Sequence, residues 1–261
     1  GSERLSGVLM ASDKGGEIVH RSYGDSGDGR PPTPDTAFRL ASLTKPVVAF
    51  AILLAAEAGE LSLDDPIAVA WPEFSGAEAV GSIQIRDLLD HSARLNPGAD
   101  LEDLELAADW SVVVDASEGE ARYANLHYQL AARLLVFKTG RTVESWVTGE
   151  FPLMKGAFEI GAWPEGRAQA SGYAVGLFDD TPAESLLPAW YRDALPVGGA
   201  TGGIATPRAM MAFGRGVAQA AVERPLIGDA VRNRSAGDFA LVYLVFDGIV
   251  SIRDGSVGVF E

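Results

Sequence analysis

Hydrophobic and polar positions alternate near both ends of the chain, which is the period of a β-strand. Residues 5–12 and 17–24 form two such segments around a Gly-containing turn, and residues 239–246 and 249–253 form two more around an Asp-Gly turn. Short apolar segments bounded in this way by Gly, Asn or Asp are typical of β-hairpins. The pattern therefore predicts one antiparallel hairpin near each terminus.

The middle of the chain follows a helical period instead. Residues 46–56 are almost entirely apolar and Gly59 is a favourable C-terminal cap, so a buried helix is expected from about Ser42 to Gly59. A second helical segment begins near Asn125, carries leucines at helical spacing and ends at Gly140. Helices are therefore expected to dominate the middle of the chain.

Strands at both ends with helices between them predict an α+β fold. The economical arrangement is an antiparallel sheet built from both chain ends and flanked by helices, with a mostly helical inserted lobe. A length of 261 residues suits one large domain. We expect a single domain over residues 1–261, with an α/β lobe at about 1–60 and 195–261 and a helical lobe at about 61–194.

Composition argues against several classes of function. A formal net charge of −15 without clustered Lys and Arg argues against a nucleic-acid partner. No apolar run reaches the ~18–20 residues of a membrane span, and the lack of cysteine removes disulfides and thiol chemistry. The histidines have no metal-ligand spacing; His91 is best explained as the anchor of a turn, and His20 and His127 have no evident partner. We therefore expect no metal and no cofactor.

Compartment and assembly state are less constrained. Gly1 and Ser2 resemble the residues that remain after an expression tag is cleaved. Such a start is compatible with the earlier removal of a signal peptide. We expect a cytoplasmic protein, with export as the alternative. The acidic net charge favours solubility and indicates no particular oligomeric state.

The start of the first predicted helix carries candidate chemistry. Ser42 and Lys45 stand three residues apart, which places both side chains on one helix face, roughly 5–6 Å apart at Cβ. A serine hydroxyl needs a neighbouring base to act as a nucleophile, and an amine desolvated by aliphatic side chains can be that base. The alternative is that Ser42 caps the helix and Lys45 is a solvated first-turn residue.

A second candidate pair stands at the entry to the second helix. Tyr123 can relay protons to a leaving group when an ammonium lies beside it, and Asn125 can donate a hydrogen bond to a substrate carbonyl. The alternative is that Asn125 is an N-cap and that Tyr123 packs against the helix as a half-buried staple. Together, the two pairs are more informative than either pair alone.

Four longer segments extend these two motifs. They are residues 33–45 around the first motif, 58–66 after its helix, 85–95 around His91, and 199–208 in a glycine-rich stretch. With these segments the chain resembles the serine β-lactamase and penicillin-binding-protein-like family, nearest to its class C and esterase branch. The resemblance implies Ser42 as nucleophile, Lys45 as its base, and Tyr123 with Asn125 as the second pair.

The family's third element is a Lys-Thr-Gly or His-x-Gly strand whose following backbone N–H completes the oxyanion hole. Residues 138–140 spell Lys-Thr-Gly, but they come soon after Asn125 and are interpreted as the C-terminal cap of a helix. The positional counterpart lies before the last hairpin, where Arg234, Ser235 and Gly237 are the expected substrate-binding residues. The resemblance implies a shortened family member with an altered third element.

We therefore predict a serine hydrolase or acyltransferase that acts on a small ester or amide through a Ser42 acyl-enzyme. Lys45 would be the general base and Tyr123 the proton relay. An esterase, amidase or transacylase is favoured over a D-Ala-D-Ala carboxypeptidase or a β-lactamase. The alternative from another class is a catalytically silent protein that binds a ligand or a partner in the same cleft.

Overall fold

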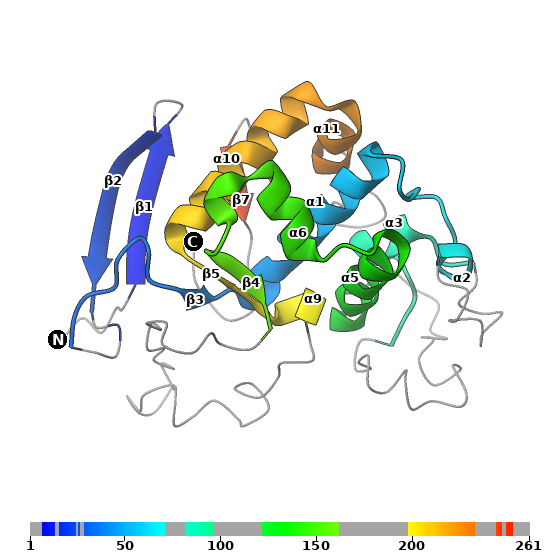
Figure 1. The fold of residues 1–261 in the computed structure, drawn as a ribbon, viewed down its shortest axis with the longest axis horizontal. Coiled ribbons are helices and arrows are strands. Elements are labelled where there is room, and N and C mark those ends of the chain that lie inside the picture. Colours follow the sequence, from blue (N-terminus) through cyan, green and yellow to red (C-terminus); the bar gives the residue numbers. More distant parts are fainter. Residues whose placement is uncertain are drawn as a thin grey trace.

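The structure is a computed structural model, and the small antiparallel sheets and the helices among its described residues confirm the α+β class (Figure 1). It describes residues 7–13, 16–24, 26, 29–70, 82–96, 122–161, 198–232, 244–246 and 249–252.

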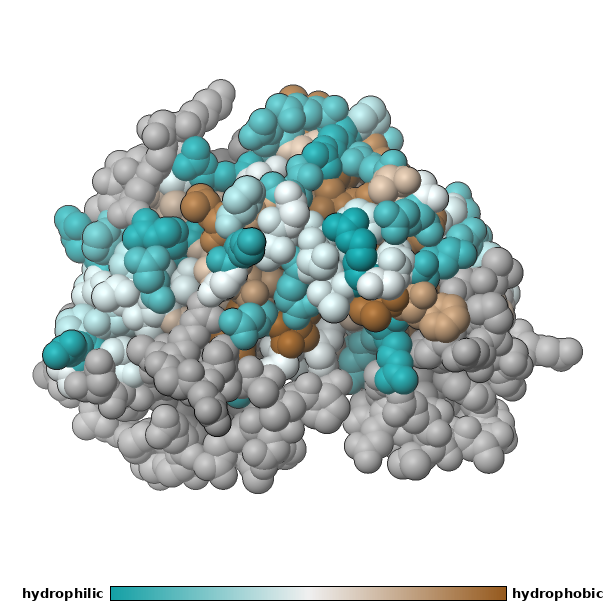
Figure 2. All heavy atoms as spheres, viewed as in Figure 1, coloured by the Kyte–Doolittle hydropathy of each residue, from teal (hydrophilic) through white to brown (hydrophobic). Residues whose placement is uncertain are grey.

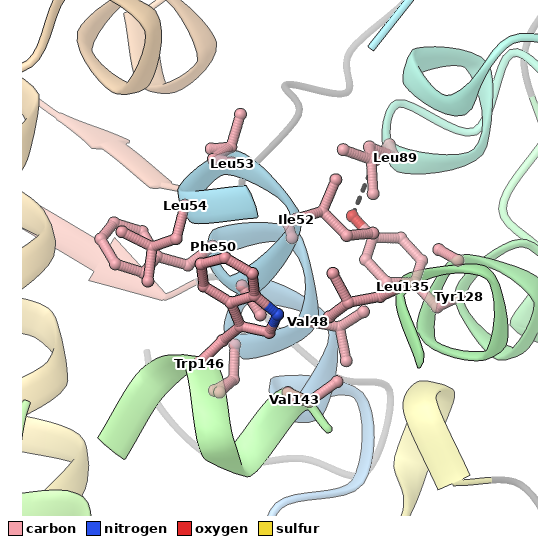
Figure 3. Packing of buried hydrophobic residues seen from close by; sticks show 14 of the residues in the cluster. Val48, Phe50, Ile52, Leu53, Leu54, Leu89, Tyr128, Leu135, Val143 and Trp146 are labelled. Carbon is pink, nitrogen blue, oxygen red and sulfur yellow. Dashed lines mark hydrogen bonds between the residues drawn. The ribbon is translucent and has the colours of Figure 1, made fainter. Parts of the chain in front are cut away.

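Helix α1, Thr44–Glu57, is the central element. Every residue from Thr44 to Ala55 is buried, because this helix is apolar on nearly all sides and is therefore surrounded by protein. Four helices pack against it: α5 (Asn125–Thr139), α6 (Val143–Glu150), α9 (Gly198–Thr201) and α11 (Pro225–Arg232). Figure 3 shows its side chains Val48, Phe50 and Ile52 within the core. Full burial of each such side chain contributes about 1.5–3 kcal/mol to the stability of the fold. Helix α1 therefore holds the residues of its first turn firmly in place.

Both ends of α1 agree closely with the sequence pattern. The helix stops at the predicted glycine, where Gly59 has the left-handed φ of +73° that favours this residue. At the other end, Ala41–Leu43 form a 3₁₀ turn, so Ser42 lies just before the regular helix rather than in its first turn. Such tight turns are common at helix N-termini.

The middle of the chain, where it is described, is mostly helical. Its elements are α2 (Ile67–Ala70), α3 (Ile85–Leu89), α5 (Asn125–Thr139), α6 (Val143–Glu150) and the 3₁₀ turn η4 (Pro152–Met154). In Figure 1, α5, α3 and α2 lie to the right of α1. Helix α5 begins and ends where the sequence predicts, and Gly140 behind it has a φ of 66°. No helix in the described ranges is both long enough and apolar enough to cross a membrane.

A short sheet, which the sequence pattern does not predict, links distant parts of the chain. It contains β3 (Phe38–Arg39), β5 (Gly203–Ala205) and β4 (Phe158–Ile160), in the order β3-β5-β4 and antiparallel throughout. All of β5 is buried. The four-residue helix α9, Gly198–Thr201, directly precedes β5 and packs against both α1 and α5. This sheet therefore fixes the 3₁₀ turn that carries Ser42.

The predicted terminal hairpins are both present. The first consists of β1 (Gly7–Asp13) and β2 (Gly16–Tyr23), and the last of β6 (Leu244–Phe246) and β7 (Ile249–Ile252). Among the described residues each hairpin pairs within itself, and helix α10 (Pro207–Glu223) contacts both β1 and β7. Helix α11 (Pro225–Arg232) continues from α10 and contacts α1. The division into two lobes stays a prediction.

The face drawn in Figure 2 is mostly polar among the described residues, with small separate hydrophobic areas. Exposed large hydrophobic side chains occur on several elements and belong to Leu9, Tyr23, Tyr123, Val136, Phe137, Leu153 and Val222. Scattered exposure of this kind is usual on a protein surface. Of these residues, Tyr123 differs because it lies beside Ser42 and Lys45.

Candidate active site

Four side chains predicted from the sequence meet where the start of α1 faces the start of α5. Lys45 Nζ lies 3.2 Å from Ser42 Oγ and 2.9 Å from Asn125 Oδ1, and Tyr123 Oη lies 2.5 Å from Ser42 Oγ. These are hydrogen-bonding distances. The alternatives in which these residues are only helix caps therefore do not describe this geometry.

Lys45 is the buried member of this group. Its side chain is 0% exposed, and Nζ donates hydrogen bonds to Ser42 Oγ, to Asn125 Oδ1 and, at 3.0 Å, to the carbonyl oxygen of Ala200. Burying an ammonium costs free energy unless its N–H groups are hydrogen-bonded. At this site the three acceptor oxygens provide those bonds. Burial lowers the pKa of Lys45 from 10.5 to about 7, so near neutral pH it can hold a proton or release one.

Tyr123 forms the outer side of the site. Its side chain is 36% exposed, in contrast to Lys45 beneath it, and Lys45 Nζ lies 4.6 Å from the centre of its ring. A cation at this distance is attracted to the negative face of an aromatic ring. The Tyr123 hydroxyl therefore bonds Ser42 on the exposed side of the site, while the buried amine lies against the Tyr123 ring.

Asn125 contributes an acceptor rather than a helix cap. It is the first residue of α5, and the N-cap position belongs to Ala124. Because Asn125 Oδ1 accepts from Lys45, the amide nitrogen points to a different neighbour and can donate elsewhere.

Thr44 holds the 3₁₀ turn that carries Ser42. Its Oγ1 donates to the Ala41 carbonyl at 2.7 Å and accepts from the Gly203 N–H at 2.9 Å. The Gly203 carbonyl in turn accepts from the Leu40 N–H at 2.8 Å. A Cβ at Gly203 would lie 2.6 Å from Thr44 Oγ1, so only glycine permits this contact. The bonds also account for Ala41, which keeps a left-handed φ of 46° next to Ser42.

Helix α9 brings a functional atom that sequence reasoning missed. The Ala200 carbonyl bonds Lys45 only because α9 approaches α5 very closely. A Cβ at Gly199 would lie 2.3 Å from Ala132 Cβ and 2.4 Å from the Tyr128 carbonyl oxygen. A backbone carbonyl has no signature in a sequence, although the glycine-rich stretch from 198 to 203 marks the close approach that places it.

Of the two candidates for the third element, one lies in the described part of the chain and the other does not. Lys138 is exposed in the last turn of α5, roughly 20 Å along the helix from Asn125 at 1.5 Å per residue. The interpretation of residues 138–140 as a helix end is therefore confirmed. Arg234, Ser235 and Gly237 lie outside the described residues, so their assignment stays a prediction. No group of three or more His, Asp or Glu side chains in the described part of the chain could hold a metal ion.

Comparison with known proteins relates the chain to one family. The sequence model of the Beta-lactamase family matches residues 1–256. The chain is 32% identical over 224 residues to esterase EstB from Burkholderia gladioli, a match that covers 74% of this chain and 55% of the esterase. The chain thus spans about half the length of that relative.

Two solved structures share the fold at low sequence identity. The D-amino acid amidase from Ochrobactrum anthropi has a TM-score of 0.66 and 20% identity, over 87% of this chain and 69% of the amidase. A class C β-lactamase from Rhodobacter sphaeroides has a TM-score of 0.64 and 22% identity, over 85% of this chain and 64% of the lactamase. Given a family model that matches nearly the whole sequence, this chain belongs to the Beta-lactamase family.

Proposed function

We propose that the protein is a serine hydrolase or acyltransferase that cleaves a small ester or amide through an acyl-enzyme on Ser42. The observation that carries the proposal is the buried Lys45 amine, 3.2 Å from Ser42 Oγ, with a pKa of about 7. An amine of this kind is neutral often enough near pH 7 to take the serine proton, which an ordinary lysine is not.

The positions of Ser42, Lys45 and Tyr123 suggest the order of the steps in acylation. Ser42 Oγ bonds to the substrate carbonyl carbon while its proton passes to Lys45 Nζ. The bond to the leaving group then breaks, and the leaving oxygen or nitrogen takes a proton from Tyr123 Oη. The Tyr123 phenolate recovers a proton from the Lys45 ammonium, so both groups return to their starting states. Tyr123 suits this role because its hydroxyl lies 2.5 Å from Ser42 Oγ, beside the bond that breaks.

Release of the acyl group repeats these steps in reverse with a different acceptor. Water or an alcohol gives its proton to the same bases and attacks the Ser42 ester, and Ser42 regains its proton as it leaves. The exposed position of Tyr123 supports access of such an acceptor from solvent. Hydrolysis and transfer differ only in which acceptor arrives.

The oxyanion and the substrate need further groups. The Ser42 N–H and the Gly237 N–H are our candidates for the oxyanion hole, where one donor is typically worth ~3–4 kcal/mol. Asn125, Arg234 and Ser235 are the candidates for holding the substrate. Only Ser42 and Asn125 of this set lie in the described part of the chain.

An ester is the preferred substrate class, because the relative at 32% identity is named an esterase. An amidase remains the next choice, since the D-amino acid amidase has the same fold. A silent ligand-binding protein is the alternative from another class. The close Ser42–Lys45–Tyr123 geometry argues against it, because a binding cleft needs no lysine with a lowered pKa.

The test is hydrolysis of two butyrate esters by the wild type and by Ser42→Ala, Lys45→Ala and Tyr123→Phe. p-Nitrophenolate can leave as an anion, whereas ethoxide must be protonated as it leaves. Tyr123→Phe should therefore lower kcat/KM more for ethyl butyrate than for p-nitrophenyl butyrate. Ser42→Ala and Lys45→Ala should lower it for both, by at least ~10²-fold for Lys45→Ala. Equal losses with Tyr123→Phe would make Tyr123 the base instead. Turnover by Ser42→Ala at the wild-type rate, or no turnover by the wild type, would contradict the proposal.

A further inference from the structure

Two buried histidines lie directly behind Tyr123 and have no part in the chemistry described so far. His91 follows α3 and His127 lies on α5; each side chain is 1% exposed, and the two Nδ1 atoms are 2.8 Å apart. The His91 ring packs on the Tyr123 ring, with 4.7 Å between centroids. The His91 ring also lies 5.3 Å from the Tyr128 ring, and the Tyr128 hydroxyl is fixed by a hydrogen bond to the Leu89 carbonyl (Figure 3).

The hydrogen bonds assign the protons of this pair. The Ala124 N–H donates to His91 Nδ1 at 3.4 Å, so this nitrogen carries a lone pair and no proton. The proton between the two rings therefore sits on His127 Nδ1. Both rings are neutral in this arrangement, and one donates to the other.

The charged and titratable groups around the pair keep it neutral. Burial lowers the pKa of both histidines, and the Lys45 charge on α1 lowers both further. Asp90 acts in the opposite direction on His127 but does not outweigh burial. Tyr123 and Tyr128 face His91 with their rings. The pair therefore does not change charge in the range where Lys45 titrates.

His91 is connected to Tyr123 in two ways. Its Nδ1 holds the backbone N–H of Ala124, the residue next to Tyr123, and its ring packs on the Tyr123 ring. Tyr123 itself precedes helix α5, because the extended Ala124 (φ −141°, ψ 139°) is the N-cap. The regular helix therefore does not set the rotamer of Tyr123, whereas a buried and hydrogen-bonded ring beside it can.

We propose that His91, held in place by His127, is a positioning residue for Tyr123. The neutral histidine pair provides the inner wall on which the Tyr123 ring rests, so that its hydroxyl stays within hydrogen-bonding distance of Ser42. The proposal rests on the proposed function, because it gives Tyr123 a chemical role. A histidine that was merely part of the core would affect stability without a specific effect on the step that needs Tyr123.

Two substitutions at one position separate the ring from its nitrogen. His91 has a φ of 61°, a region that Asn tolerates well, and an Asn oxygen occupies roughly the place of Nδ1. His91→Asn therefore keeps an acceptor for Ala124 but removes the ring that supports Tyr123. His91→Phe keeps a ring and removes the acceptor. Trp146→Phe is the matched control, because Trp146 is a buried aromatic on α6 that bonds Thr139, away from the site.

The experiment compares kcat/KM for ethyl butyrate and p-nitrophenyl butyrate, since kcat/KM reports the steps up to the acyl-enzyme. His91→Asn should reproduce the pattern of Tyr123→Phe, with a loss of at least about tenfold for the ethyl ester and a smaller loss for the nitrophenyl ester. In the Tyr123→Phe background, His91→Asn should change either value by less than about twofold, because both act through the same group. His91→Phe should keep the wild-type ratio of the two esters to within about threefold. Trp146→Phe should lower the melting temperature and leave the ratio unchanged.

The outcomes separate this inference from the proposed function. If Tyr123→Phe changes the rates and His91→Asn does not, or if the two losses multiply in the double variant, the positioning role is wrong and the catalytic role of Tyr123 stands. If Tyr123→Phe has no effect, both are overturned. Should His91→Asn fail to fold, His91→Phe decides alone, because a wild-type ratio supports the ring contact and the Tyr123→Phe pattern contradicts it.

Discussion

Lys45 Nζ donates to Asn125 Oδ1 across 2.9 Å and joins the first turns of two helices that are 80 residues apart in the sequence. The same nitrogen faces Ser42 Oγ and the Ala200 carbonyl, so one amine connects the serine turn, helix α5 and helix α9. Because the three acceptors fix its position without carrying a full negative charge, burial dominates and the pKa falls.

The first prediction concerns the pH dependence of turnover. For the wild type, kcat/KM should rise with pH and level off above about 7, as Lys45 loses its proton and becomes a base. The pKa values of His91 and His127 are lowered by burial, so neither histidine explains a limb at that pH. The measurement is a pH profile with p-nitrophenyl butyrate. A profile that stays flat from about pH 5 to 9 would show that Lys45 is not the base.

The second prediction concerns stability. The unfolded chain keeps the ordinary Lys45 pKa of 10.5, whereas the folded protein has about 7. Below about pH 7 both states hold the proton, and the folded state bears the full cost of burying it. Between about 7 and 10.5 the folded state releases its proton first, so this cost falls and then vanishes.

Lys45→Met removes this titration and serves as the reference. The free energy of unfolding of the wild type should therefore rise relative to Lys45→Met as the pH increases from about 7 to 10. Urea denaturation at several pH values measures the difference. The other lysines cancel in the comparison, so a difference that is independent of pH would mean that the Lys45 pKa is not lowered.

The third prediction tests the close approach of α9 to α5. Gly199→Ala places a Cβ against Ala132 and the Tyr128 carbonyl, which should cost about 1–3 kcal/mol of stability and move the Ala200 carbonyl away from Lys45. Turnover should fall together with stability. Gly214→Ala is the control, because a Cβ there meets nothing within 4 Å on helix α10 and should stabilise the protein by about 0.4–1 kcal/mol. Similar behaviour of the two variants in thermal unfolding would refute the packing argument.

The fourth prediction concerns the Lys-Thr-Gly sequence at residues 138–140. Lys138→Ala should cost a few tenths of a kcal/mol, from the loss of a cation at a helix C-terminus, and leave kcat and KM within about twofold of the wild type. Lys45→Ala provides the comparison in the same assay. A loss of turnover with Lys138→Ala as large as that with Lys45→Ala would show that an exposed residue at the far end of α5 takes part in the reaction.

Much of this structure was predictable because local signals coincide with it. Gly59 and Gly140 both end helices with a positive φ, and the apolar run after Lys45 is the buried central helix. The proximity of Ser42 and Lys45 follows from their spacing in the sequence. The family resemblance implied that Tyr123 and Asn125 lie beside them. Short-range patterns of this kind are visible in a sequence.

The remainder depends on contacts between distant segments. The sheet β3-β5-β4 has strands of two or three residues, too short to show an alternating pattern. The Ala200 carbonyl is a backbone atom, and His91 and His127 pair only because two helices pack together. Isolated His residues in a sequence give no sign of such a partner.

The most direct test of the central claim is the intact mass of the protein after exposure to a fluorophosphonate. We predict the addition of one phosphonyl group, located on Ser42 by peptide mapping, and no addition to Ser42→Ala. Ser92→Ala is the matched control, since Ser92 is a half-buried serine whose hydroxyl bonds Asp87, and it should be labelled like the wild type. Labelling of Ser42→Ala, or a label that maps to Ser92 or Ser235, would contradict the account.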